Sequence, residues 1–339
     1  MTTIFSKEDF KLCDVPVPSG YPQSQTHCSI SIKNDNFYLS TSPYPARMKK
    51  YLIYFRAIIR KLSFKLLCNE LRAECYENPC IYKAQGDSMN TPIKFVPMNL
   101  KPLMDTPDPC YGYPAFNSDP ELLIEGEKIY IINRSTYRKE KGYVNRLYLI
   151  EGVDDNNWFK LLSIKLLIEE QRAFMSPCVI KHNNQYIMTY LDTNSYNDGK
   201  TYRGMYYTRL DSLAQLASVK IWNKIDVNFD EYLPWHMSLF SESGRIYAIV
   251  ACTKKGETRK CWQMLGEFTD DLSSLRIYKT PLTDYNSYRS SAIVHDGNFI
   301  LYNATVDEKI PGGKSVDGRE IIVAEMPFEE VLSRLKRYE

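Results

Sequence analysis

The 339-residue chain lacks any apolar run long and uncharged enough to cross a membrane, and its first nine residues hold no apolar signal segment. The GxGxxG fingerprint, the phosphate-binding P-loop, the GxSxG elbow and the HExxH zinc motif are all absent. Basic and acidic residues nearly balance, with 43 Lys and Arg against 41 Asp and Glu, so no charge field for nucleic acid is expected. We therefore expect a cytoplasmic protein with no nucleic-acid partner.

Paired cysteines are also missing. The nine cysteines are odd in number and contain no CxxC pair. Several, such as Cys178 and Cys252, lie within expected strands, where a free thiol behaves as a small apolar residue. This cysteine usage is typical of a reducing compartment and agrees with a cytoplasmic location.

Acidic residues are absent between Asp35 and Glu70. Within this gap, apolar residues of 47–67 recur at spacings of three and four, and basic residues occupy the other side of the pattern. The pattern predicts a basic amphipathic helix. Such a helix can pack its apolar side on the flank of the domain, or it can make a peripheral contact with an anionic membrane.

A weak motif that recurs five times is the strongest positive feature of the chain. Each copy has a small or polar pair, an apolar run, a polar turn and a second run of aromatic and aliphatic residues, at 26–38, 118–130, 176–186, 235–247 and 289–299. Each copy predicts a β-hairpin, and units of roughly 40–60 residues are typical of four-stranded propeller blades.

We therefore expect an all-β fold, a five-bladed β-propeller that forms a single domain over 1–339. A helical and proline-rich insertion is expected in blade one, at about 46–112. Residues 10–13 are expected to complete the last blade, and residues 327–337 are expected to form a short C-terminal helix.

Aligning the hairpins places five side chains at one equivalent position: His27, Asp119, Ser176, His236 and Arg289. In a propeller such positions surround the central channel, where ionisable side chains are costly to bury unless they are solvated or paired. They can line a binding site, or they can plug the channel through mutual hydrogen bonds.

With these hairpins in place, the chain resembles the five-bladed β-propeller glycosidases of glycoside hydrolase family 43 and its clan, with residues 118–122 the closest local match. The resemblance implies that Asp119 tunes the pKa of a catalytic acid, that His236 lies near a central metal or water, and that Arg289 helps to hold the site. The family's usual base and acid positions hold His27 and Ser176 instead. Neither carboxylate that inverting hydrolysis requires is therefore in register.

We expect a carbohydrate-active protein, a glycoside hydrolase that acts on an oligo- or polysaccharide at the mouth of the channel. The predicted catalytic residues are Asp119, His27 and Glu121, because Glu121 shares a strand face with Asp119 and the pKa of histidine is close to neutrality. The predicted substrate-binding residues are Ser176, His236, Arg289, Trp235, Tyr113, Asp192 and Tyr288. The alternative is a non-hydrolytic propeller that binds glycan or glycolipid as an accessory protein of polysaccharide metabolism.

No resident metal or cofactor is indicated by a sequence motif. A metal-dependent alternative remains, because His27, Asp119 and His236 offer two imidazoles and a carboxylate around one axis. This ligand set suits divalent iron or zinc. Ligands drawn from three blades leave no spacing in the sequence by which to test the alternative.

Overall fold

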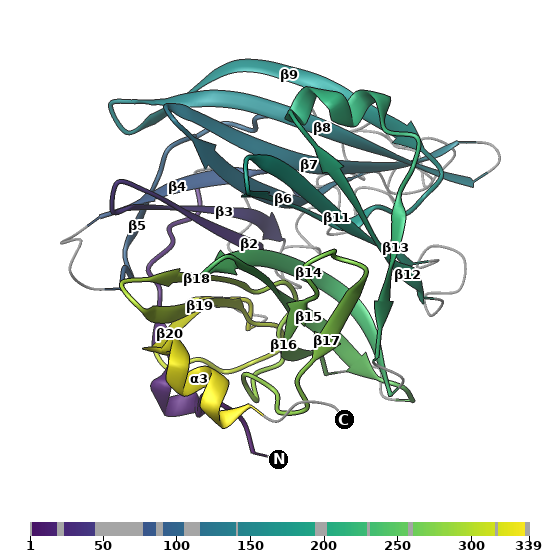
Figure 1. Ribbon diagram of the computed structural model, residues 1–339. Coiled ribbons are helices and arrows are strands. Elements are labelled where there is room, and N and C mark those ends of the chain that lie inside the picture. The colour runs from purple at the N-terminus through teal and green to yellow at the C-terminus, as the bar shows by residue number, and fades with distance from the viewer. Residues whose placement is uncertain are drawn as a thin grey trace, which may run out of the picture.

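The computed structural model of the protein describes residues 2–18, 24–44, 77–85, 91–104, 116–139, 142–193, 202–228, 231–256, 260–315 and 318–335. Strands arranged in four sheets dominate these residues (Figure 1). The first sheet has the order β2 (Ser24–Lys33), β3 (Asn36–Tyr44), β4 (Cys80–Ala84) and β5 (Phe95–Pro97). The second has the order β6 (Phe116–Glu125), β7 (Lys128–Lys139), β8 (Gly142–Asp155) and β9 (Trp158–Glu170).

The third sheet has eight strands, which form two antiparallel runs of four. One run is β10 (Met175–His182), β11 (Gln185–Thr193), β12 (Tyr202–Leu210) and β13 (Asn223–Val227). The other is β14 (Tyr232–Glu242), β15 (Arg245–Lys254), β16 (Trp262–Phe268) and β17 (Ser274–Ile277). Among the described residues, the two runs pair with each other as strands through β13 and β17, their outermost strands, which run parallel.

The fourth sheet joins the two ends of the chain, with the order β1 (Lys11–Leu12), β20 (Ile321–Pro327), β19 (Asn298–Ala304) and β18 (Ser291–His295). The pairing of β1 with β20 confirms the role expected for 10–13. The short helices among the described residues are η1 (Lys7–Asp9), η3 (Leu213–Ser218) and α3 (Phe328–Arg334). Helix α3 confirms the C-terminal helix predicted within 327–337.

Tight turns explain why the five repeated segments fold as hairpins. All five pair as predicted: β2 with β3, β6 with β7, β10 with β11, β14 with β15, and β18 with β19. Their turns contain residues with positive φ, such as Asn34, Asp35, Gly126 and Gly244. Asn, Asp and Gly adopt this conformation at the lowest cost, and two-residue hairpin loops require it.

Hydrophobic clusters link successive four-strand runs into a closed ring. One cluster joins the first sheet to the second, and another joins the second sheet to β10–β12. A third joins the β10–β13 run to the β14–β17 run, and a fourth joins β14–β16 to the last sheet and α3. The fifth joins the last sheet back to the first. Each run is thus held by apolar packing on both of its faces, and the innermost strands all surround one axis.

The range 46–112, predicted as an insertion, contributes two strands to the first sheet, β4 and β5. The buried side chains of Cys80, Ile81 and Tyr82 attach β4 to the neighbouring strands, although prolines surround it in the sequence. The amphipathic segment 47–67 lies outside the described residues. Within the described ranges, no helix is long and apolar enough to span a membrane.

The described cysteines are free thiols, and all but one of them are buried. Cys178 and Cys252 lie in strands β10 and β15, as expected. Burial raises the pKa of both thiols, and both belong to the hydrophobic cluster between the β10–β13 and β14–β17 runs. Both therefore act as packing residues.

Candidate functional site

Three of the aligned positions share an unusual backbone conformation. His27, Asp119 and Ser176 have positive φ angles of 54°, 55° and 50°. At each of them the strand pairing shifts its register, in β2, β6 and β10 respectively. Left-handed backbone at non-glycine residues costs about 1–3 kcal/mol and persists where the surrounding structure enforces it. Three of the five aligned copies therefore share a local distortion, and two ionisable side chains, His27 and Asp119, lie on it.

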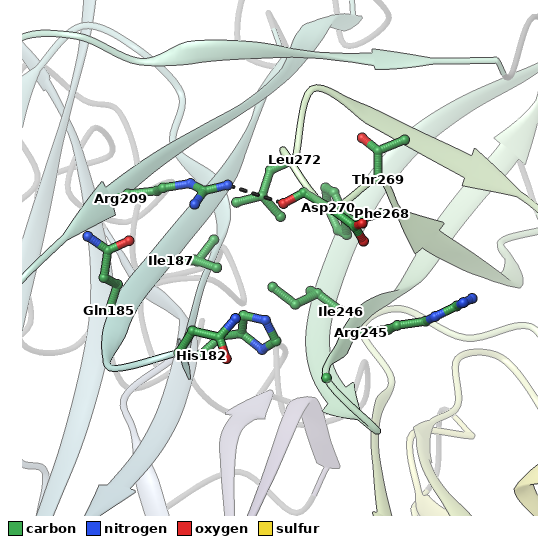
Figure 2. A pocket seen from close by; sticks show the side chains of 12 residues that line it. His182, Gln185, Ile187, Arg209, Arg245, Ile246, Phe268, Thr269, Asp270 and Leu272 are labelled. Atoms are coloured by element: carbon green, nitrogen blue, oxygen red, sulfur yellow. Dashed lines mark hydrogen bonds between the residues drawn. The ribbon is translucent and has the colours of Figure 1, made fainter.

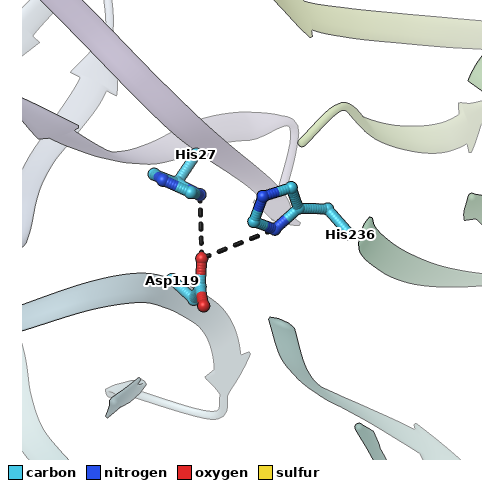
Figure 3. Close-up of side chains that lie close together, drawn as sticks. All are labelled: His27, Asp119 and His236. Atoms are coloured by element: carbon cyan, nitrogen blue, oxygen red, sulfur yellow. Dashed lines mark ion pairs between the residues drawn. The ribbon is translucent and has the colours of Figure 1, made fainter. Parts of the chain in front are cut away.

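Figure 3 shows His27, Asp119 and His236 pointing toward one another from strands β2, β6 and β14. Nδ1 of His27 lies 2.8 Å from Oδ1 of Asp119, and Nδ1 of His236 lies 3.6 Å from the same oxygen. The two imidazole rings are 4.8 Å apart and meet edge to face. One carboxylate oxygen thus faces two histidines that come from different sheets.

The other carboxylate oxygen of Asp119 is held by two donors. Nη2 of Arg134 lies 2.8 Å from Oδ2, and the backbone N–H of Ser176 donates to the same atom at 3.2 Å. Burial by itself would raise the pKa of this fully buried carboxyl group, but Arg134 and His27 hold the pKa of Asp119 well below its usual value. Asp119 is therefore ionised at neutral pH.

Both histidines of the cluster are neutral at neutral pH. Burial lowers the pKa of His27, although the adjacent Asp119 partly opposes this effect. Burial also lowers the pKa of His236, to about 3, against the same opposition. A neutral imidazole has one ring nitrogen with a free lone pair, so each can accept a proton or bind an electrophile.

Tyr288 and Glu77 lie beside the cluster. The Tyr288 ring is nearly parallel to that of His27 at 5.9 Å, and it meets His236 edge to face at 5.7 Å. The guanidinium of Arg319 lies 5.0 Å from the centre of the Tyr288 ring. Oε2 of the buried Glu77 lies 3.8 Å from Nε2 of His27.

Sequence reasoning missed three of the site's charged residues, namely Arg134, Glu77 and Arg319. Arg134 lies on β7, the second strand of its hairpin, one strand away from the aligned positions. Glu77 lies three residues before the start of β4 in the proline-rich range, and Arg319 lies two residues before the start of β20. None of the three belongs to the repeated motif, so alignment of the repeats could not identify them.

Arg289 and Glu121 form a separate buried ion pair. Arg289 is 0% exposed, and it also donates to the backbone carbonyls of Met237 at 3.1 Å and Pro120 at 3.0 Å. Glu121 accepts a hydrogen bond of 2.9 Å from the hydroxyl of Ser29. Burial raises the pKa of Glu121, and the adjacent guanidinium opposes this rise. The pair bridges β2, β6, β14 and the segment before β18.

The remaining predicted residues are placed in different surroundings. Ser176 is fully buried, and its hydroxyl donates to the Met237 carbonyl at 2.9 Å. Trp235 is half-buried, and its indole N–H donates to the Thr253 hydroxyl at 3.0 Å. Asp192 lies near the end of β11, where its charge acts on Arg172. Tyr113 lies outside the described residues.

A small hollow lies at the opposite ends of β10 and β14, beside their hairpin turns (Figure 2). His182, Arg209, Arg245 and Asp270 are among its lining residues, and its volume is about 60 Å³. Arg209 is held there by a hydrogen bond to the Asp270 carbonyl at 3.3 Å. None of the site residues predicted from the sequence lines this hollow, and it is not part of the His27–Asp119–His236 cluster.

The chain matches no protein-family model and no curated protein sequence. It is similar in structure to an N-acetylgalactosamine deacetylase from F. plautii, solved with blood group B trisaccharide. The TM-score is 0.66 at 14% identity, over 96% of this chain and 98% of that one.

Two glycoside hydrolases have similar structures as well. The family 43 β-xylosidase/α-arabinofuranosidase CoXyl43, from a compost microbial metagenome, gives a TM-score of 0.57 at 13% identity, over 93% of this chain and 94% of that one. A family 117 glycoside hydrolase from Zobellia galactanivorans gives 0.55 at 11% identity, over 94% and 90%. The chain therefore has a propeller fold shared by several groups of carbohydrate-active enzymes.

Proposed function

We propose that this protein is a carbohydrate-active hydrolase and that its glycan binds over the cluster of His27, Asp119 and His236. The observation that carries the proposal is the cluster itself: an ionised carboxylate and two neutral imidazoles meet at the strand ends of three sheets. Buried ionisable groups with strongly shifted pKa values are concentrated at functional sites. The structural likeness to enzymes that act on sugars supports a glycan as the ligand.

We also propose that the four sheets correspond to five blades. The eight-stranded sheet then counts as two blades, β10–β13 and β14–β17, which pair with each other only through their outermost strands. Five hydrophobic clusters between successive runs support this count. Five blades would place the cluster at the mouth of the channel, with Arg289 and Glu121 as a plug that holds the innermost strands together.

The geometry disfavours a mechanism with two flanking carboxylates. Inverting glycosidases place two carboxyl groups about 6.5–9.5 Å apart, with substrate and water between them. Here Glu121 is paired with Arg289, while Glu77 and Asp119 approach opposite nitrogens of His27. The imidazole occupies the space that a glycosidic bond would need. We propose that the cluster itself activates the attacking water.

Removal of an N-acyl group from an amino sugar is the second candidate reaction. It needs one activated water and a group that passes the proton of that water to the leaving nitrogen, and the cluster offers an ionised carboxylate and two neutral imidazoles for these roles. The first similar structure named above is that of an N-acetylgalactosamine deacetylase, matched over nearly its whole length. Glycoside hydrolysis and deacetylation are both hydrolytic, so one panel of substrates can separate them.

The test is a panel of aryl-glycosides, oligosaccharides and N-acetylated sugars in which reducing ends and acetate are measured separately. We expect release of one product by the wild-type protein, and a fall of at least about 100-fold in kcat/KM for Asp119→Asn, the magnitude that loss of a general-base function produces. Asp226→Asn is the matched control, because Asp226 is exposed on β13. Glycan binding without turnover would favour the accessory role, and turnover indifferent to Asp119→Asn would contradict this site.

A further inference from the structure

We infer that His27, Asp119 and His236 bind one divalent metal ion of the class that accepts imidazole and carboxylate ligands, with zinc as the representative ion. Each residue offers one ligand atom, and these atoms all lie within 4.8 Å of one another. The inference deepens the proposed function by naming what activates the water, but metal binding can be measured without any glycan.

The spacing of the ligand atoms fits one ion. Ligands at about 2.0–2.2 Å from a tetrahedral zinc stand roughly 3.3–3.6 Å from each other. The distance from Oδ1 of Asp119 to Nδ1 of His27 is 2.8 Å, below this range, and the distance to Nδ1 of His236 is 3.6 Å, at its upper end. Since the ligand atoms all lie within 4.8 Å of one another, shifts of about an ångström would bring all three into the first coordination shell.

The two ring nitrogens give an independent indication. Nδ1 of His27 and Nδ1 of His236 are buried, and neither makes a hydrogen bond of acceptable geometry within the described part of the chain. A buried polar atom without a hydrogen bond costs about 1–3 kcal/mol. Both atoms face the same carboxylate oxygen, so a single cation between them would compensate both nitrogens.

Groups around the cluster already hold its members in the orientation of ligands. Arg134 and the Ser176 N–H hold Oδ2 of Asp119, which leaves Oδ1 toward the imidazoles. Glu77 lies 3.8 Å from Nε2 of His27, the nitrogen that would remain outside the coordination shell. A carboxylate behind a ligating imidazole is the usual second-shell arrangement, and it fixes the tautomer and the ring orientation. Glu77 is thus a positioning residue in this inference.

Local charge is compatible with a cation. The groups in contact with the cluster or next to it include three guanidiniums, from Arg134, Arg289 and Arg319, and three carboxylates, from Glu77, Asp119 and Glu121. Two of the guanidiniums are paired directly with a carboxylate, Arg134 with Asp119 and Arg289 with Glu121. A bound divalent ion would supply Lewis acidity and a water of lowered pKa, the chemistry that hydrolysis of an ester, amide or glycoside uses.

The experiment is a zinc titration of the full-length protein, with any purification tag removed and bound metal stripped by a chelator. Calorimetry measures affinity, and elemental analysis after dialysis counts the ions. We expect one equivalent per chain in the wild type. Glu77→Gln should weaken binding by about 10–100-fold. Asp119→Asn and His236→Gln should weaken it further, because they remove ligands.

His182→Gln is the matched control, since His182 is a histidine at the other end of the sheet. It should bind zinc as the wild type does. Cobalt substitution gives a second readout, because visible absorption bands report nitrogen and oxygen ligation of the ion. Circular dichroism establishes that each variant is folded. If His236→Gln does not fold, Glu77→Gln and the cobalt spectrum of the wild type still decide the question.

Substoichiometric or millimolar binding by the wild type would overturn the inference, as would equal affinity in Asp119→Asn and His236→Gln. Full hydrolytic activity after chelation would also overturn it while leaving the proposed function in place. Zinc bound at one equivalent by a protein with no activity on any glycan would support the metal site and contradict the proposed function. The two proposals therefore fail separately.

Discussion

Replacement of Arg289 by methionine should cause a large loss of stability. The guanidinium is 0% exposed, and it is paired with Glu121 and bonded to the carbonyls of Met237 and Pro120. Removing one partner of a buried ion pair costs about 3–5 kcal/mol, because the other charge is left without compensation. At roughly 2–4 °C per kcal/mol for a large domain, the melting temperature should fall by on the order of 10 °C.

Urea denaturation followed by tryptophan fluorescence measures this loss. The matched control is Arg245→Met, whose ion pair with Glu267 is at the surface, since the Arg245 side chain is 59% exposed. The control should lose no more than about 1 kcal/mol. The double variant Arg289→Met with Glu121→Met should regain much of the stability that the single variant loses, because a buried ion pair can be replaced by apolar side chains at little cost.

Two outcomes would refute this reasoning. If Arg289→Met loses less than about 1 kcal/mol, the pair does not hold the innermost strands together. If the double variant is less stable than Arg289→Met, the two side chains act independently. The substrate-binding role predicted from the sequence gives a different result, a loss of glycan affinity at unchanged stability.

Three further predictions concern other parts of the molecule. Gly152→Ala should lower the free energy of unfolding by about 1–3 kcal/mol in urea denaturation, because a Cβ would overlap the ring of Phe159. Asp154 accepts hydrogen bonds from Lys83 at 2.8 Å and from Tyr38 at 2.9 Å, and these bonds outweigh the effect of burial and lower its pKa. The stabilisation is therefore present above the unfolded-state pKa and lost as pH falls through the lower folded-state pKa. Asp154→Asn should cost about 1 kcal/mol at pH 7 and progressively less as the pH falls below about 4, measured by urea denaturation over this range. Tyr288→Leu should weaken glycan binding by about tenfold, or about 1.4 kcal/mol by calorimetry, if the ring supports the sugar; unchanged affinity would remove Tyr288 from the binding surface.

The hairpins could be predicted because their signals are local. A polar turn such as Asn34–Asp35 sets the φ angles of a two-residue loop, and the alternation of side chains on either side determines which face is buried. The same reasoning aligned His27, Asp119 and Ser176, which share a left-handed backbone angle and a register shift. The expected completion of the last blade placed β1, and the C-terminal helix was predicted where α3 lies, but strands β4 and β5 within the proline-rich range were not predicted.

The sequence by itself thus determined which residues form hairpins and which side chains face the common axis. Only the tertiary structure decided how deep each side chain lies along that axis. Arg289 and Glu121 pair with each other in the interior, whereas His27, Asp119 and His236 meet beside the half-buried Tyr288. The physical reason is that pKa, pairing and ligand geometry depend on distances between strands far apart in the chain. The local pattern of residues in the sequence does not determine those distances.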